Sequence, residues 1–154
     1  MKRIPLTKGF EAIVDDEWYS ILSQWNWYYS NGYAMRDIGT RDNNETIFMH
    51  RYITMAASVY QVDHINRNRL DNRFENLRVI TPEKNYYSRA KQSNNTSGYK
   101  GVAFDKSRNK YMATITKGRK QHNLGRFNTA KEAAIAYNAA AQQFFGEYAY
   151  LNDV

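Results

Sequence analysis

An eight-residue stretch without any apolar side chain, KQSNNTSG at residues 91–98, constrains the fold of this chain more than any other feature. It is rich in Ser and Asn and ends in Gly, which is typical of a linker between domains. The chain has 154 residues, of which 42% are hydrophobic and 15% aromatic, enough for compact cores. The sequence therefore predicts two small domains, residues 1–90 and 98–154, joined by a linker over residues 91–97.

The positive charge is concentrated after the linker. Residues 1–90 carry 12 Lys and Arg against 11 Asp and Glu, whereas residues 91–154 carry 10 against 4. A basic region attracts polyanions, and a sequence pI near 9.5 makes nucleic acid the leading expected partner. A merely solvated basic surface is the alternative.

Several classes of protein are excluded by what the sequence lacks. No apolar run approaches the roughly 20 residues that cross a bilayer, and the N-terminus has no signal-peptide segment. We therefore expect a cytoplasmic protein with no membrane partner. The chain has no cysteine, so disulfides and thiolate zinc sites are excluded and any metal has oxygen and nitrogen ligands.

The C-terminal part has the clearest pattern of strands and helix. Strands are predicted over residues 99–105, 110–116 and 121–127. In the helix that follows, Thr129 and Glu132 form a capping box, and Gly146 is placed to end it. Its apolar stripe consists of Ala133, Ala134, Tyr137, Ala141, Phe144 and Phe145. We expect a three-stranded antiparallel sheet that packs on one helix.

Such a sheet leaves its second face uncovered. In the middle strand Tyr111, Ala113 and Ile115 share one face, and the alternate residues share the other. The predicted uncovered face is polar and basic, a surface that can enter a major groove. It comprises Lys100, Met112, Thr114, Thr116, Gln121, Asn123 and Arg126. Alternatively, these residues are only the solvent side of a two-layer domain.

The C-terminal segments YKGVAFDKSRNKYMATI and LGRFNTAKEAAIAYNAAAQQFFGEYAYLN resemble the Apetala-two or ethylene-response-factor DNA-binding domain, from residue 98 to about 152. In that family the sheet reads the DNA major groove. Lys100 keeps the basic character of a matching position, but Ala103, Thr114, Thr116, Gln121 and Asn123 do not reproduce the family's arginines, glutamate and tryptophan. The resemblance implies DNA binding, with a different preferred sequence.

Before the linker, the stretch VDHINRNRLDNRFENLRVITPEKN at residues 62–85 predicts two short strands and a helix start. Thr81 as N-cap and Pro82 at the first helical position give that start. A carboxylate and an amide oxygen, from Asp63 and Asn85, suit Mg²⁺ or Mn²⁺, and a neutral His64 can take a proton from water. Neighbours in a regular strand point to opposite faces, so Asp63 and His64 share a site only at an irregularity or a strand edge.

This stretch resembles the HNH nucleases, the ββα-metal or His-Me finger group, and specifically the homing endonucleases of phages and introns. The match runs from His50-Arg51 to Asn85. It implies that Asp63 and Asn85 bind the metal and that His64 is the general base. It also implies that the Asn76 side chain pins the loop between the strands.

Other polar residues near this stretch are assigned supporting roles. His50 closes the strand pattern ETIFMHRYI, and with Arg51 it is assigned a structural or phosphate-contacting role. Asn66, Asn68 and Asn72 are assigned to an ordinary polar loop. Four arginines that flank the predicted site are expected to contact phosphates, namely Arg67, Arg69, Arg73 and Arg78. A hairpin is predicted around Asn31-Gly32.

The sequence thus predicts an α+β protein in which an HNH nuclease domain precedes an Apetala-two-like domain. The expected activity is hydrolysis of a phosphodiester in double-stranded DNA with one divalent cation, Mg²⁺ or Mn²⁺. The main alternative is a DNA-binding regulator without catalysis, and an RNA-directed module rests only on charge and aromatics. No protein partner is inferred, and monomer and dimer remain open, as do the DNA target and nicking against double-strand cleavage.

Overall fold

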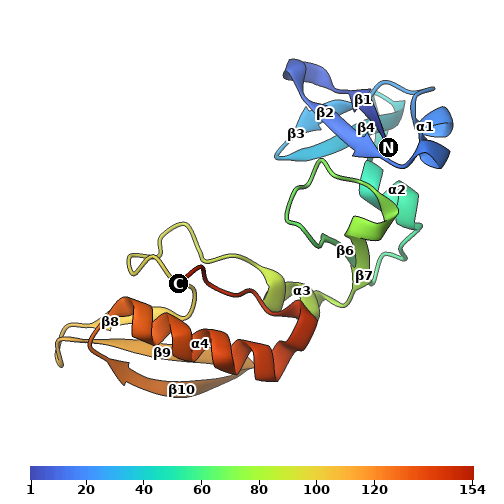
Figure 1. The fold of residues 1–154 in the computed structure, drawn as a ribbon. Coiled ribbons are helices and arrows are strands. Elements are labelled where there is room, and N and C mark those ends of the chain that lie inside the picture. Colours follow the sequence, from blue (N-terminus) through green and yellow to red (C-terminus); the bar gives the residue numbers. More distant parts are fainter. The chain divides into compact units, whose positions relative to one another are not determined.

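The computed structural model describes residues 1–154, which form two compact units, Met1–Pro82 and Glu83–Val154 (Figure 1). Each unit combines helices with antiparallel sheet, as the predicted α+β class requires. None of the helices has the length and hydropathy of a membrane span. The two units are described separately.

The first unit begins with two antiparallel sheets. Strands β1 (Lys2–Pro5) and β2 (Glu11–Val14) pair with each other, and α1 (Asp16–Leu22) follows. A three-stranded sheet then forms in the order β3 (Tyr28–Ser30), β4 (Tyr33–Thr40) and β5 (Asn43–Phe48). Asn31 and Gly32 link β3 to β4 with φ angles of 50° and 88°, which confirms the predicted hairpin.

One predicted strand is wrong in its second half. The ETIFMHRYI pattern continues β5 only to Phe48, and Met49–Thr54 form helix α2. Met49 and Ile53 lie four residues apart and are both buried, as the core-facing side of a helix requires. His50 therefore lies on a buried helix, not at the end of a strand.

The predicted ββ part of the HNH stretch is confirmed. Strand β6 (Gln61–His64) pairs antiparallel with β7 (Leu77–Ile80), and a 3₁₀ turn, η2 (Phe74–Asn76), precedes β7. Leu77 joins the main core of this unit. The other buried members of that core are Ile4, Leu6, Ala12, Val14, Leu22, Trp27, Ala34, Met49 and Ile53.

The second unit has the predicted sheet and helix. Strands β8 (Val102–Asp105), β9 (Lys110–Lys117) and β10 (Lys120–Phe127) form an antiparallel sheet in the order β10-β9-β8. Helix α4 (Ala130–Phe145) lies along one face of this sheet (Figure 1). The capping box of Thr129 and Glu132 is present, and Gly146 ends α4 before the 3₁₀ turn η3 (Gly146–Tyr148). Of the predicted stripe, only Phe144 is half-buried rather than buried.

Helix α3 (Pro82–Ser88) begins at the predicted proline and packs on the second unit. The ring of Tyr87 stacks on Phe145 at a centroid distance of 3.8 Å. The Lys100 ammonium donates to the carbonyls of Tyr87 and Arg89, at 2.8 and 2.6 Å, where the helix ends. By packing, the second unit thus begins at Glu83, and the domain limits drawn at residues 90 and 98 stay a prediction.

Candidate nuclease site and DNA-binding face

The β6–β7 hairpin separates the two central residues of the predicted site. Its register is regular, with Asp63 opposite Arg78 and His64 opposite Leu77. Consecutive residues in a paired strand point to opposite faces, so the Asp63 carboxylate and the His64 imidazole leave β6 on different sides. Asp63 is half-buried, and Arg78 donates to its Oδ2 from two nitrogens, at 3.0 and 2.7 Å.

His64 lies in a buried cluster of aromatic and polar side chains in the first unit. Only 4% of the residue is exposed. Its ring lies 5.2 Å from the His50 ring and 6.3 Å from the Tyr33 ring, centroid to centroid. Its Nε2 is 3.4 Å from the Oδ1 of Asn72, a residue with no exposed surface. His64 is therefore held on one side by an amide group that the loop supplies.

Burial keeps both histidines of this cluster uncharged. It lowers the pKa of His64 from its ordinary 6.5, against opposing effects of the Asn72 contact and of the Asp63 and Asp71 charges. For His50, burial is the main cause that lowers the pKa, to about 3, and the neighbouring Arg51 charge acts in the same direction. The His50 Nδ1 is buried without a hydrogen-bond partner. A neutral His64 is the form that a general base needs.

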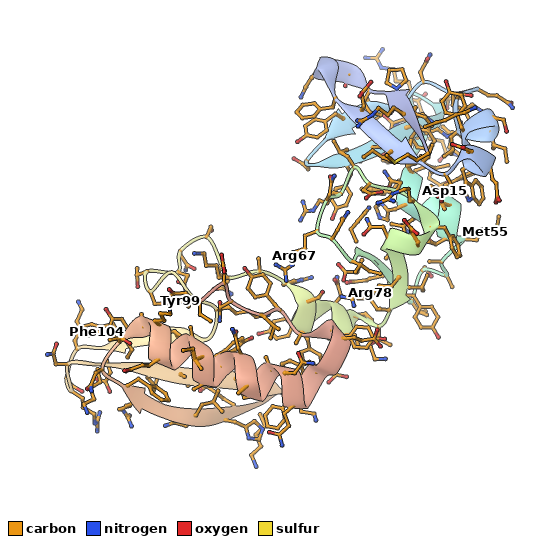
Figure 2. All side chains as sticks on the ribbon, in the orientation of Figure 1. Asp15, Met55, Arg67, Arg78, Tyr99 and Phe104 are labelled. Carbon is orange, nitrogen blue, oxygen red and sulfur yellow. The ribbon has the colours of Figure 1, made fainter.

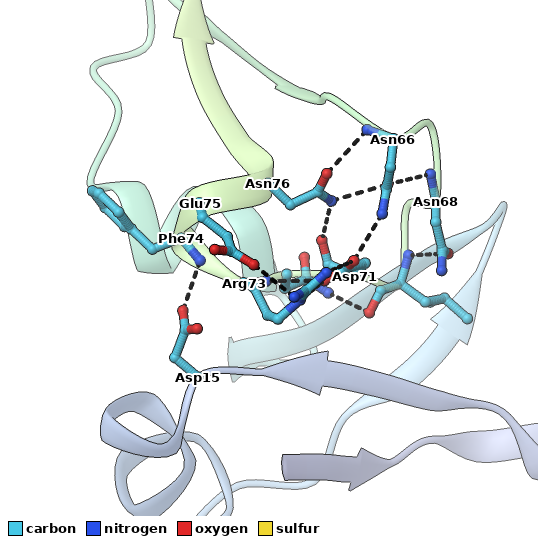
Figure 3. A network of polar contacts seen from close by, with 10 residues as sticks. Asp15, Asn66, Asn68, Asp71, Arg73, Phe74, Glu75 and Asn76 are labelled. Atoms are coloured by element: carbon cyan, nitrogen blue, oxygen red, sulfur yellow. Dashed lines mark hydrogen bonds and ion pairs between the residues drawn. The ribbon is translucent and has the colours of Figure 1, made fainter. Parts of the chain in front are cut away.

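The loop after β6 is a hydrogen-bonded network rather than a simple turn (Figure 3). The Asn76 amide donates to the Asp71 carbonyl at 2.7 Å and to Asn66 Oδ1 at 3.0 Å, and its oxygen accepts from the Asn66 N–H. The buried Asp71 carboxylate accepts from Arg73 and from the Asn66 amide. Arg73 lowers the pKa of Asp71, so its charge persists at neutral pH. Asn76 thus joins the two ends of the loop.

The same loop is anchored to the N-terminal hairpin. The Ile13 N–H donates to the Leu70 carbonyl and its carbonyl accepts from the Asn72 N–H, both at 2.8 Å. This is a parallel bridge between β2 and the loop at Asp71. The Asp15 carboxylate accepts from the Phe74 N–H at 2.7 Å (Figure 3). Backbone far away in sequence therefore fixes the segment that carries Asn72.

The flanking basic residues have partners within the protein. Arg73 bonds to Asp71 and Glu75, and Arg78, labelled in Figure 2, bonds to Asp63. Arg69 donates to the Asn31 carbonyl and lies 4.7 Å from the centre of the Tyr33 ring. Arg51 donates to three carbonyls, those of Ala56, Ala57 and Tyr60. Arg67, also labelled in Figure 2, has a left-handed φ of 64°.

The second predicted metal ligand, Asn85, lies in α3 and is assigned by packing to the second unit. Its carbonyl accepts from the Ser88 hydroxyl at 3.0 Å, and its side-chain oxygen is 3.4 Å from that hydroxyl. No group of three or more His, Asp or Glu side chains is arranged to hold a metal.

The uncovered face of the β8–β10 sheet carries six of the seven residues predicted for it, all except Lys100, which precedes β8. Cross-strand pairs join Gln121 to Thr116, Asn123 to Thr114 and Arg126 to Met112, so these six residues share a face. The alternate residues of β9, Ala113 and Ile115, are buried toward α4. Two of the predicted cations have structural partners: Arg126 pairs with Asp105, and Lys100 binds the end of α3.

Three buried polar residues were missed by the sequence prediction. Asp71 organises the loop and Asn72 faces His64, although both looked like ordinary loop residues. Asn152 bonds to both backbone groups of Lys100 and to Asn138, and so fixes the end of the chain to the start of the sheet. For Asn152 the signal was present in the closing Leu-Asn pair of the family resemblance.

Comparison with known proteins supports both resemblances. The family model described as HNH endonuclease matches residues 48–87, and that of the AP2 domain matches residues 97–147. An uncharacterized HNH endonuclease of Acanthamoeba polyphaga mimivirus is 33% identical over 149 residues, 96% of this chain and 77% of the relative. Protein 3.8 of Escherichia phage T7 is 32% identical over 90 residues, 58% of this chain and 74% of the relative. No solved structure matches significantly. The chain belongs to the HNH endonuclease family and carries an AP2 domain in its C-terminal part.

Proposed function

We propose that this protein is a homing-type DNA endonuclease that depends on a divalent cation and is targeted by its AP2 domain. The main support is the placement of His64, a neutral imidazole held by Asn72 on the hairpin of the segment that matches the HNH endonuclease model. DNA as the substrate is supported by the AP2 match and by the basic composition of residues 91–154.

Asp63 and Asn85 are the residues proposed to hold the ion. Their carboxylate and amide oxygens are hard donors, which suit Mg²⁺ or Mn²⁺. Both Arg78 bonds to Asp63 involve Oδ2, which leaves Oδ1 as the oxygen that can meet an ion. When bound, the cation supplies positive charge that stabilises the phosphoryl and leaving oxygens.

The orientation of Asn72 decides which nitrogen of His64 acts as the base. The Asn72 amide nitrogen donates to the Leu70 carbonyl at 3.2 Å, so its Oδ1 faces His64 and can only accept. A neutral His64 then carries its proton on Nε2 and has its lone pair on Nδ1. We assign Nδ1 as the atom that takes the proton of the attacking water.

The proposed reaction is hydrolysis of one phosphodiester bond. The water oxygen bonds to phosphorus, its proton passes to His64 Nδ1, and the bond from phosphorus to the 3′-oxygen breaks. By family resemblance the products have 5′-phosphate and 3′-hydroxyl ends, and the 3′-oxygen receives a proton from solvent. Since Asp63 and His64 leave β6 on opposite faces, the ion is assigned to the Asp63 face and proton transfer to the His64 face.

The test is incubation of the full chain with supercoiled plasmid DNA, with Mg²⁺, with Mn²⁺ and with a chelator. Nicked circles are expected first, because one site per chain cuts one strand at each engagement. Conversion must stop with chelator and return when the cation is restored. Absence of nicking with every divalent cation, for a preparation that binds duplex DNA, would overturn the nuclease proposal.

A second candidate is a DNA-binding regulator without catalysis. It is favoured by two observations, the 4% exposure of His64 and the ion pair of Asp63 with Arg78, both of which suit a purely structural hairpin. The plasmid experiment distinguishes the two: this candidate requires duplex binding with no cation-dependent change in plasmid form.

A further inference from the structure

A groove of about 490 Å³ lies within the second unit, beside the uncovered sheet face. One side is formed by sheet residues, among them Thr114, Thr116 and Gln121. The other side is formed by the segment that follows α3, with Arg89, Lys91 and Asn94 among its lining residues. The sequence assigned most of this segment to a linker, whereas the structure makes it a wall of a groove. We call residues 89–98 the basic arm.

The basic arm has fixed contacts with the body of the second unit. Lys100 donates to the Arg89 carbonyl at 2.6 Å, and the Lys91 ammonium donates to the Gly98 carbonyl at 2.6 Å. The Asn95 amide donates to the Tyr99 carbonyl, and its oxygen accepts from the Gly98 N–H. Ser97 donates to the Val102 carbonyl of β8. These bonds give the arm a defined path along the sheet, so its side chains have a defined position beside the groove.

The charge of the groove selects an anionic occupant. Arg89, Lys91 and Lys100 line it, and no Asp or Glu does. Lys100 is already bonded to two carbonyls, which leaves Arg89 and Lys91 as the exposed cations of this wall. The amides and hydroxyls of Asn94, Thr114 and Gln121 add neutral hydrogen-bonding groups along the same groove.

We propose that the basic arm is part of the DNA-binding surface and that Arg89 and Lys91 contact phosphates of the strand that borders the sheet. This inference rests on the proposed DNA binding by the uncovered sheet face. Thr114, Thr116 and Gln121 belong to both the groove and that face, so DNA seated on the face brings its backbone past the arm. Phosphate contacts position a protein without selecting a sequence, so the arm contributes affinity and not preference.

The test measures the salt dependence of binding between the full chain and a short random-sequence duplex. Log affinity falls linearly with log salt concentration, and each phosphate contact makes this fall steeper by about 0.9. Arg89→Gln and Lys91→Gln should each make the slope shallower by about 0.9. Lys131→Gln is the matched control, because it removes the same charge from an exposed position on α4 and should leave the slope unchanged. Arg89→Gln is the cleaner variant, since Lys91 also bonds to Gly98.

The outcomes separate this inference from the proposed function. If the wild-type chain does not bind duplex DNA, DNA binding itself fails. If the wild type binds and both arm variants match Lys131→Gln, only the role of the arm is overturned. A second measurement compares several duplex sequences: equal weakening on all of them supports phosphate contact. Weakening confined to one sequence would show that the arm reads bases and would overturn the assignment to phosphates.

Discussion

Two polar segments of this protein that both contain asparagines and basic residues, the loop at residues 65–76 and the basic arm at residues 89–98, have different structures. In the loop Asp71, Asn72 and Asn76 are buried. Asp71 and Asn76 bond to other residues of the loop, and Asn72 faces His64 and donates its N–H to the Ile13 carbonyl of β2. In the arm no residue is buried, and the hydrogen bonds join the arm to itself and to the adjacent strand and turn. Asparagines therefore belong to an internal framework in one unit and to an exposed surface in the other.

The difference shows what decides the role of a polar segment. The loop has a distant backbone partner, Ile13 of β2, which pairs with it beside the buried residues Asp71 and Asn72. A buried polar group must be paired, and the two buried asparagines of the loop, Asn72 and Asn76, each have a specific partner. The arm meets only the edge of its own unit and keeps its cations at the surface. We expect substitutions in the loop to affect stability and chemistry, and substitutions in the arm to affect binding.

The largest expected effect is on cleavage. His64→Ala removes the proposed base and should reduce plasmid nicking by about 10² to 10⁴, with unchanged affinity for duplex DNA. His122→Ala, in the second unit, is the matched control and should nick at the wild-type rate. Loss of duplex binding by His64→Ala in a gel shift would show that the surroundings of His64 belong to the DNA-binding surface. The loop and the arm would then no longer differ in function.

The next effect is on stability. Asp71→Ala leaves the Arg73 guanidinium and the Asn66 amide without their buried acceptor, and should lower the free energy of unfolding by about 3 kcal/mol. Asn95→Ala in the arm should cost less than about 1 kcal/mol. All three tryptophans lie in the first unit, so tryptophan fluorescence reports the urea unfolding of that unit and is used for the loop variant. Circular dichroism is used to measure the unfolding of the arm variant. Similar losses in both variants would contradict the structural difference.

A pH dependence of the first unit should follow from His50. Its pKa is about 3 in the folded state and near 6.5 when unfolded, so between these values the unfolded chain binds more protons. The free energy of unfolding should therefore be greatest above about pH 6.5 and fall as the pH decreases, by at most about 1.4 kcal/mol per pH unit from this residue. His64 adds to the same slope. In His50→Phe, the free energy of unfolding measured by tryptophan fluorescence should change less with pH between about pH 5 and about pH 6.5. An unchanged slope in that variant would refute the assignment.

The smallest effect expected is that of Asn72. At neutral pH, ¹⁵N NMR of the three imidazoles should show His64 with its proton on Nε2. Asn72→Ala should mix the two tautomers and slow nicking about tenfold, equivalent to about 1.4 kcal/mol. Asn72→Asp retains an acceptor and should retain the tautomer. A wild-type His64 with its proton on Nδ1 would exclude Asn72 as the group that sets the base, whatever the nicking rate.

Sequence patterns were sufficient where local periodicity controls the structure. The alternation in β9 and the capping box of Thr129 and Glu132 predicted the sheet and helix of the second unit. The ETIFMHRYI run did not distinguish a strand from a helix, because a short apolar run suits both a strand and a buried helix. Likewise, nothing local to Asn72 shows that Ile13 will pair beside it or that the side chain will face His64. The roles of Asp71 and Asn72 depend on contacts between distant segments, which composition does not contain.

The parallel bridge from Ile13 to the loop has a consequence for protein engineering. The matched HNH segment, residues 48–87, does not include Ile13 or Asp15. A chimera that transplants only this segment would leave the Leu70 carbonyl, the Asn72 N–H and the Phe74 N–H without the partners that position them. A transferable cassette must therefore include β2 and Asp15 as well as the matched segment, and an exchange of catalytic cassettes between relatives should not place a crossover between β2 and β7.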